Sequence, residues 1–430
     1  MSERPVKFDK LRVCVVGPFL PRPGGVSVQT EILCRFLAQE HAIVRRVDTN
    51  VESVRQIPLV GHWLLPLAQV LAVLWRLVRA APRSDVIHVQ AASYWAFYLP
   101  VTLSLLFGRL LRRRVVVSFF GGMAAEFMAR HQRWAWPMLR RLDGFAVSSQ
   151  FLREVFQRYG VEALVIPSVI EIERFPFRQR AEWPPLVLWM RSLMAHANPA
   201  MALRAFALLR QSLPEARLMM IGRGPLAQEV SALARELGVA EAIAYRPWLP
   251  FPQLRQAMQS ASVLWNTNSY DNFPLSVLEA AASGAVIIST AVGGMPELLT
   301  DGVDGLLVES DDHAALAAAT AQVLRRPMLA DGLARNARLV VERYSWAGIR
   351  EDIAALYGLV PVDPLARRRW HEYDDSGEWE PPPPGAGSVE WEIMGLRGRA
   401  EFLQGQPEPS QPETPTAPQT TPTGRRARRR

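Results

Sequence analysis

Short apolar runs recur along the first 310 positions of the chain, and longer stretches of helical period separate them. Such runs, bounded by turn residues, are typical of buried strands in a parallel sheet. They form two series, at residues 11–16, 43–47, 86–89, 115–118 and 144–147, and then at 186–190, 216–221, 262–265, 285–288 and 306–308. Strands alternating with helices indicate a doubly wound α/β sheet, so we predict two Rossmann-like domains facing a cleft.

Chain length and composition set the domain boundaries. With 430 residues, of which 49% are apolar, the chain fits two domains plus extensions. A Pro-containing segment at 168–185 divides the two series, which places the domains at residues 1–170 and 171–345. Residues 361–430 contain four consecutive prolines and end in RRARRR, so we expect a disordered Pro/Arg-rich tail.

Two uncharged stretches, at residues 56–75 and 86–108, need comparison with membrane-spanning helices. Both contain proline, and the second is better explained as a strand, a loop and a helix. The start of the chain has no apolar signal-peptide core, so we expect a cytoplasmic protein. A surface-lying amphipathic segment in the first domain stays open as an alternative.

The net charge of +8 is unevenly distributed. Residues 1–180 hold 25 basic and 13 acidic side chains, a balance of +12, which favours an anionic partner for the first domain. Peripheral contact with an anionic membrane, at its inner face, is one alternative. We expect no nucleic-acid binding, because the corresponding motifs are lacking. Cys14 and Cys34 lie in a predicted strand and helix, which favours buried thiols over a disulfide or a metal site.

The stretch 266–294, NTNSYDNFPLSVLEAAASGAVIISTAVGG, carries the strongest chemical signal. A helix is predicted to begin at Pro274, which suits the first helical position. The N–H groups of Leu275 and Ser276 would then point toward a bound anion. Asp271 and Glu279 are eight residues apart, and a carboxylate one turn behind an anion site can accept hydrogen bonds from sugar hydroxyls. This pattern suits a nucleotide diphosphate lying over the helix N-terminus.

The same stretch resembles the Glu-x7-Glu signature of the family-4 retaining glycosyltransferases, which have the two-domain GT-B fold. Asp271 stands where the first Glu is usual, Glu279 holds the second position, and residues 283–308 resemble the family's next strand, helix and turn. The resemblance covers about residues 11–358. It implies a GT-B protein of a variant branch, with a last helix at 346–360 returning to the first domain.

For function, the resemblance implies transfer of a hexose-type sugar from a nucleotide-diphosphate donor to a glycan or lipid-linked acceptor, with retention, in the synthesis of cell-surface polysaccharides or glycoconjugates. The nucleotide sugar is a co-substrate, and no resident cofactor or metal is expected. Asp271 would hold a hydroxyl of the sugar and Glu279 the ribose. The residues between them are expected to line the donor site: Asn272, Phe273, Pro274, Leu275 and Ser276.

Two further loops of the second domain resemble donor-binding segments of the family. Arg191 matches an Arg that clamps the diphosphate, as a forked guanidinium can. His196 stands where a Lys is usual and would donate if the diphosphate kept it protonated. The sequence IGRGPL resembles the family's Gly-x-Gly-Pro turn, in which Gly222 and Gly224 are expected to let the chain pass close to the donor or its base.

The first domain supplies the acceptor side in this interpretation. Gly24 and Gly25 open a helix after the first strand and would allow close approach of a ligand. The segment Phe120, Gly121 and Gly122 resembles a loop in which His-Gly-Gly is common. That histidine contacts the transferred sugar in the family, and a phenylalanine cannot hydrogen-bond to it. Glu126 is an acidic candidate nearby, whereas His88 is interpreted as structural.

Two alternatives remain open. The Phe at 120 and the missing Lys also fit a catalytically silent homologue that binds a nucleotide sugar as a partner subunit. A nucleotide-sugar epimerase of the same fold would need its own acid–base pair, and the sequence identifies none. The residues do not name the sugar, the base, the acceptor, the oligomeric state or the role of the tail.

Overall fold

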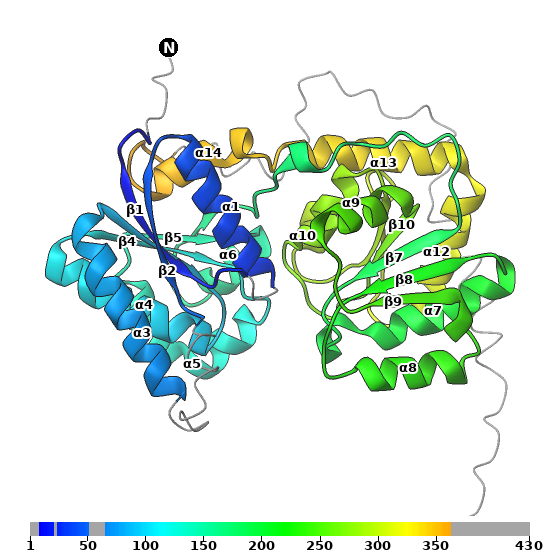
Figure 1. The fold of residues 1–430 in the computed structure, drawn as a ribbon, viewed down its shortest axis with the longest axis horizontal. Helices are drawn as coiled ribbons and strands as arrows, with labels where there is room; N and C mark the ends of the chain where they lie inside the picture. Colours follow the sequence, from blue (N-terminus) through cyan, green and yellow to red (C-terminus); the bar gives the residue numbers. More distant parts are fainter. Residues whose placement is uncertain (1–7, 21–23, 51–64, 363–430) are drawn as a thin grey trace, which may run out of the picture.

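The computed structural model describes residues 8–20, 24–50 and 65–362. The expected tail lies almost entirely outside these residues, as does the first part of the uncharged stretch 56–75. Within the described residues the chain forms two parallel six-stranded sheets, each covered by helices on both faces (Figure 1). The predicted fold class is therefore confirmed.

The first sheet has the order β2-β1-β3-β4-β5-β6. Its strands are β1 Arg12–Gly17, β2 Ile43–Asp48, β3 Val86–Ala91, β4 Arg114–Phe119, β5 Gly144–Val147 and β6 Leu164–Val165. Alternate residues of these strands face opposite sides, so the core of this domain divides into two apolar layers. Val13, Val15 and Val116 belong to one layer, and Cys14, Val16 and Val117 belong to the other.

Helices from both ends of the chain cover the first sheet. One face carries α1 Gly25–Gln39 and α14 Trp346–Leu356, and the other carries α3 Leu65–Ala80, α4 Trp95–Leu111 and α5 Ala124–Leu139 (Figure 1). The domain ends with α6 Gln150–Gln157 before β6. The uncharged stretch 86–108 forms β3 followed by most of α4, as predicted.

The second sheet has the order β12-β11-β10-β7-β8-β9. Its strands are β7 Leu186–Met190, β8 Arg217–Ile221, β9 Ile243–Arg246, β10 Val263–Asn266, β11 Val286–Thr290 and β12 Leu306–Val308. Around it lie α7 Pro199–Ser212, α8 Ala227–Glu236, α9 Phe251–Ser260, α10 Leu275–Ala282, α11 Met295–Leu298, α12 His313–Arg325 and α13 Pro327–Glu342. The sequence pattern missed β6 and β9, because β6 has two residues and β9 is a largely exposed edge strand without an apolar run.

The last helix ties the end of the described chain to the first domain. The indole of Trp346 stacks on Phe36, with ring centroids 5.1 Å apart, and its Nε1–H donates to Glu40 at 2.9 Å. Arg350 donates to the same carboxylate at 3.0 Å. Because α14 follows α13 directly, it joins the outer layer of the second domain to a face of the first (Figure 1).

His88 forms a buried polar network under α14. Its Nδ1 lies 2.8 Å from the Tyr357 hydroxyl, and its Nε2 lies 2.8 Å from both the Ser118 hydroxyl and the Gln90 amide nitrogen. The amide nitrogen can only donate, so Nε2 accepts and Nδ1–H donates to Tyr357. Burial lowers the pKa of His88 to about 3, which keeps the ring neutral. This histidine is structural, in agreement with the sequence interpretation.

Both cysteines are buried as free thiols, and burial raises the pKa of each to about 12. Across the residues that the structure describes, no helix is long and apolar enough to cross a bilayer, and no cluster of His, Cys, Asp and Glu has the makings of a metal site.

We predict that Tyr357→Phe destabilises the protein by about 1–3 kcal/mol, because it leaves the buried Nδ1–H of His88 without an acceptor. Urea-induced unfolding measures the loss. Tyr159→Phe in the first domain is the matched control, since the Tyr159 hydroxyl makes no hydrogen bond to the described residues. Equal unfolding free energies for the two variants would show that the hydroxyl does not anchor α14.

Candidate functional site

The predicted donor residues gather at one edge of the second sheet. Arg191 follows β7, Gly222 follows β8, and the loop to Asp271 follows β10. The three strands are parallel neighbours in the sheet, so their carboxyl ends lie at the same edge. Sequence positions that are 80 apart thereby come into contact.

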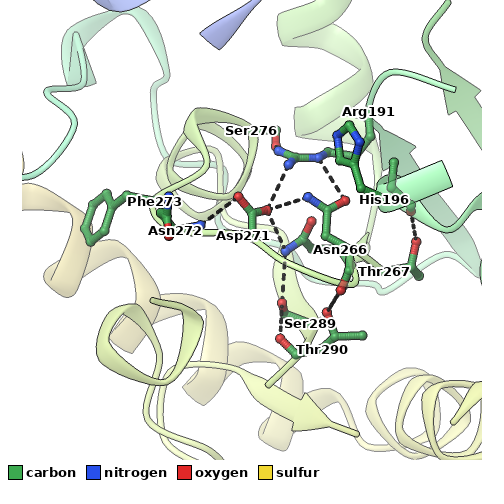
Figure 2. A network of polar contacts seen from close by, with 12 residues as sticks. Arg191, His196, Asn266, Thr267, Asp271, Asn272, Phe273, Ser276, Ser289 and Thr290 are labelled. Carbon is green, nitrogen blue, oxygen red and sulfur yellow. Dashed lines mark hydrogen bonds and ion pairs between the residues drawn. The ribbon is translucent and has the colours of Figure 1, made fainter. Parts of the chain in front are cut away.

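An ion pair between Arg191 and Asp271 forms the centre of this edge (Figure 2). The guanidinium Nη2 lies 2.9 Å from Asp271 Oδ2, and the two side chains are only 20% and 10% exposed. Nε of Arg191 donates to Asn268 Oδ1 at 3.2 Å, and Nη1 lies 3.4 Å from the Ser276 hydroxyl. The arginine therefore spans from the loop after β10 to the first turn of α10.

The carboxylate of Asp271 is held by several donors. Besides Arg191, its Oδ2 accepts from Asn268 Nδ2 at 2.7 Å and from Asn266 Nδ2 at 3.3 Å. Its Oδ1 accepts the backbone N–H of Asn272 at 3.0 Å. The carboxylate that was predicted to bind the sugar therefore already accepts hydrogen bonds within the protein. Oδ1 accepts one of them and Oδ2 accepts three.

Helix α10 begins one residue later than predicted. Pro274 is the N-cap, with an extended backbone (ψ 124°), and its carbonyl accepts the N–H groups of Val277 and Leu278. Leu275 is the first helical residue. Its N–H and that of Ser276 have no acceptor among the described residues, as expected for a helix N-terminus open to an anion. Because Ser276 also touches Arg191, the helix N-terminus and the guanidinium converge on one place.

Glu279 lies one turn inside α10 and is partly exposed. Its carboxyl group forms no hydrogen bond or ion pair with the described residues. Desolvation by the surrounding protein raises its pKa to about 8, with the nearby Arg174 acting in the opposite direction. The raised pKa favours the protonated form of Glu279, whereas the sequence interpretation took it as a carboxylate acceptor for the ribose.

The ring of His196 stacks on Tyr270, with centroids 5.0 Å apart. Burial lowers its pKa, and Arg191 adds to the effect, while Asp271 opposes it. The free protein thus favours the neutral ring. The expected donation by a protonated His196 requires a bound anion to reverse these effects.

The glycines of the β8–α8 turn serve loop packing. A Cβ atom on Gly222 would overlap the carbonyl oxygen of Arg191, and one on Gly224 would overlap that of Leu193. The N–H of Arg191 donates to Ile221 O at 3.2 Å across the same contact. In the structure their small size lets the backbone that carries Arg191 pack against the neighbouring turn. The expected close approach of the donor to these glycines stays a prediction.

A second glycine contact holds the backbone of Asp271 in the loop after β10. Gly293 has φ +56°, and a Cβ there would overlap the carbonyl oxygen of Asp271. The N–H of Gly294 donates to that carbonyl at 3.1 Å. The turn after β11 therefore sets the position of Asp271 from behind.

The first domain reaches this edge through the loop after β4. A Cβ on Gly122 would lie 3.0 Å from the ring of Tyr270, so the glycine lets the two domains meet. A Cβ on Gly121 would collide with Ser93. Glu126 pairs with Arg130 at 3.1 Å and contributes to the raised pKa of Tyr270, after burial. These residues lie near the loop after β10 that carries Tyr270 and Asp271, which we call the donor loop.

The hydrogen bonds of the other predicted acceptor-side residues lie within the first domain. Phe120 is partly buried, and its N–H donates to Ala91 O at 2.9 Å within the first domain. Gly24 and Gly25 are exposed at the start of α1, and a Cβ on Gly25 would meet no atom within 4 Å. The space around Gly24 and Gly25 is open to a ligand, but it does not indicate which ligand binds there.

Two residues of this region, Glu297 and Asn272, have contacts or exposures that the sequence did not show. The carboxylate of Glu297 in α11 crosses to the first domain and accepts the N–H groups of Gln150, at 2.7 Å, and Phe151 at the start of α6. Burial raises its pKa to about 7, against the effect of these hydrogen bonds. Asn272 is 4% exposed, and neither polar atom of its amide has a partner among the described residues (Figure 2). The sequence shows an acidic residue, Glu297, shortly after Gly293–Gly294. It does not show that the carboxylate contacts the start of α6 in the other domain.

Comparisons with known proteins cover the same two domains. Residues 171–340 match the family Glycosyl transferases group 1, and residues 23–174 match Glycosyltransferase Family 4. The D-inositol 3-phosphate glycosyltransferase of Actinosynnema mirum is 30% identical over 230 residues, which cover 49% of this chain and 55% of that protein. The protein of the same name from Acidothermus cellulolyticus is 32% identical over 238 residues, or 50% and 52% of the two chains. The chain thus spans about half the length of these relatives.

Solved structures of similar fold cover more of the chain. The structure of Anabaena HepE in complex with UDP-glucose has a TM-score of 0.65 at 16% identity, covering 81% of this chain and 100% of that one. Sucrose-phosphate synthase of Thermosynechococcus elongatus has a TM-score of 0.64 at 18% identity, covering 81% and 98%. At these identities the likeness establishes the two-domain fold alone.

We predict that Gly222→Ala destabilises the protein by about 1–3 kcal/mol, since the added methyl group overlaps the Arg191 carbonyl and forces the two loops apart. Urea unfolding is the measurement. Gly332→Ala in α13 is the control, because a Cβ there meets nothing within 4 Å and alanine favours a helix by up to about 1 kcal/mol. A neutral Gly222→Ala would mean that the loops separate without cost.

We also predict that the stability difference between Glu279→Gln and the unaltered protein grows as the pH rises. The folded protein holds the Glu279 proton more tightly than the unfolded chain does. The stability that comes from the protonated side chain is therefore complete below pH 4.5 and is lost as the pH rises through about 8. Glutamine has no such proton. Urea unfolding of both proteins at pH 5, 7 and 9 tests this; a difference that is constant with pH would contradict the raised pKa.

Proposed function

Since the chain belongs to the family-4 glycosyltransferases of the GT-B fold, we propose that it transfers a hexosyl group from a nucleoside-diphosphate donor to a glycan or lipid-linked acceptor, with retention. The observation that carries the proposal is the convergence of Arg191 and the α10 N-terminus at the carboxyl edge of the second sheet. HepE, whose fold is similar, has been solved with UDP-glucose, which makes UDP-sugars the first donors to test.

The diphosphate is placed against the guanidinium of Arg191 and the N–H groups of Leu275 and Ser276. The leaving nucleotide gains negative charge as the glycosidic bond breaks, and a fixed guanidinium beside a helix N-terminus stabilises that charge. In this proposal the protein itself supplies the positive charge, so the reaction requires neither a metal ion nor a resident cofactor. Donor binding makes the phosphates compete with Asp271 for Arg191.

The remaining polar groups are assigned to the sugar and the ribose. Asp271 Oδ1 and the unpaired amide of Asn272 supply acceptors and a donor for hydroxyls of the transferred sugar. Glu279, one turn further along α10, receives the ribose hydroxyls. The acceptor enters from the first domain, past Gly121–Gly122 and Glu126, in the synthesis of a cell-surface polysaccharide or glycoconjugate.

One observation favours a second candidate, a catalytically silent protein that binds the nucleotide sugar. Arg191 is already neutralised by Asp271, and Phe120 replaces the histidine that contacts the sugar in the family. Such a protein would bind the donor and neither transfer nor hydrolyse it. A nucleotide-sugar epimerase would instead convert the donor without an acceptor, and product analysis separates it from both.

We predict that Arg191→Gln lowers the rate of sugar transfer by about 10²-fold or more, the usual effect of losing one electrostatic stabiliser. The assay follows release of the nucleoside diphosphate and formation of product, after thermal-shift screening has identified the donor. Arg204→Gln on the exposed face of α7 is the matched control and should leave the rate unchanged. An unaltered rate in Arg191→Gln would remove this residue from the site, and donor binding by the unaltered protein without turnover would establish the silent homologue.

A further inference from the structure

The outer surface of α3 carries an apolar stripe. Leu67, Leu71, Trp75 and Val78 are each 52–56% exposed, and their spacing of four, four and three residues places them along one side of the helix. The opposite side is packed into the domain, where Val73 and Leu77 are fully buried. The side chains of the exposed stripe therefore do not pack in the core of the domain.

Helix α4 packs beside α3 and also exposes apolar side chains. Leu106 is 58% exposed and Leu110 is 74% exposed, whereas Phe97, Val101 and Leu105 of the same helix are buried in the core. We call these six side chains, four from α3 and two from α4, the outer apolar face. Exposed apolar side chains grouped on neighbouring helices mark an interaction surface more often than scattered single ones do.

The charges around the outer apolar face are of one sign. Four arginines stand exposed at or just beyond the C-terminal ends of α3 and α4: Arg79, Arg83, Arg109 and Arg112. Neither helix contains an acidic residue, and Asp85 between them is paired with Arg12. From residue 65 to residue 141 the sequence has 11 arginines and two acids, a balance of +9.

One arginine of this rim touches the apolar stripe directly. The guanidinium of Arg79 lies over the ring of Trp75, 4.1 Å from its centroid. An amphipathic helix with tryptophan and leucine next to arginine suits the boundary between lipid headgroups and acyl chains. A protein partner would account for the apolar side chains alone, whereas the single-sign rim favours an anionic surface.

We propose that the outer apolar face and its arginine rim dock the first domain on an anionic lipid bilayer. Leu67, Leu71, Trp75, Val78, Leu106 and Leu110 enter the interface, and the four arginines contact the anionic headgroups. The contact is peripheral, because none of the described helices is long and apolar enough to cross the bilayer. This proposal does not depend on the proposed transferase activity, since docking involves neither donor nor acceptor.

The test is flotation of the full chain with vesicles of phosphatidylcholine alone or mixed with phosphatidylglycerol. We expect binding to the anionic vesicles that weakens as salt is raised, and weak binding to the neutral ones. The double variant Leu71→Ser with Trp75→Ser should lose at least about tenfold in vesicle affinity, since both side chains leave the interface. Arg83→Gln with Arg109→Gln should weaken binding and reduce its salt dependence.

Matched controls come from the second domain. Leu339 and Trp248 are each 58% exposed there, so Leu339→Ser with Trp248→Ser removes side chains of the same kind and exposure. Arg204→Gln with Arg235→Gln removes two exposed charges. All variants replace exposed residues, and thermal unfolding checks that each is folded. No binding of the unaltered chain to anionic vesicles, or equal binding by the Leu71/Trp75 variant, overturns the proposal. Self-association in solution that this variant abolishes would instead assign the face to a second copy of the chain.

Discussion

The site depends on one carboxylate, that of Asp271. Its two oxygens accept hydrogen bonds or an ion pair from Arg191, Asn266, Asn268 and the backbone of Asn272, so the loops after β7 and β10 are held to each other. The pair is largely withdrawn from water, and a half-broken buried ion pair is costly. Arg191 is therefore kept at the start of α10 before any ligand arrives. Under the proposed function, the same contact sets a condition on donor binding, because the phosphates would have to accept hydrogen bonds that Arg191 now donates to Asp271.

Backbone packing makes this geometry rigid. Gly222 and Gly293 bring carbonyl oxygens of neighbouring loops closer than any side chain would allow, one behind Arg191 and one behind Asp271. The positioning continues into the first domain, where Gly122 meets Tyr270 and Glu297 accepts N–H groups from the start of α6. Hydrogen bonds between the domains therefore stand next to the loop that carries Asp271.

The first domain combines two surfaces with different chemistry. The loop after β4 turns toward the second domain and the polar groups of Asp271 and Asn272, while α3 and α4 present leucine, tryptophan and arginine to the outside. The exposed arginines Arg79 and Arg109 on these helices make no ion pair within the described residues. The charge is instead available for an anionic partner.

The sequence by itself determined the architecture, because buried strands and amphipathic helices impose local periodicities that survive without tertiary information. It located ten of the twelve described strands, and it marked the stretch from Asp271 to Glu279 through residues that are close in the chain. The tertiary structure decided what depends on distant partners. The pairing of Arg191 with Asp271 spans 80 residues, and the contact of Glu297 with α6 spans 147. The raised pKa of Glu279 and the lowered pKa of His196 follow from burial, which only the packed domain creates.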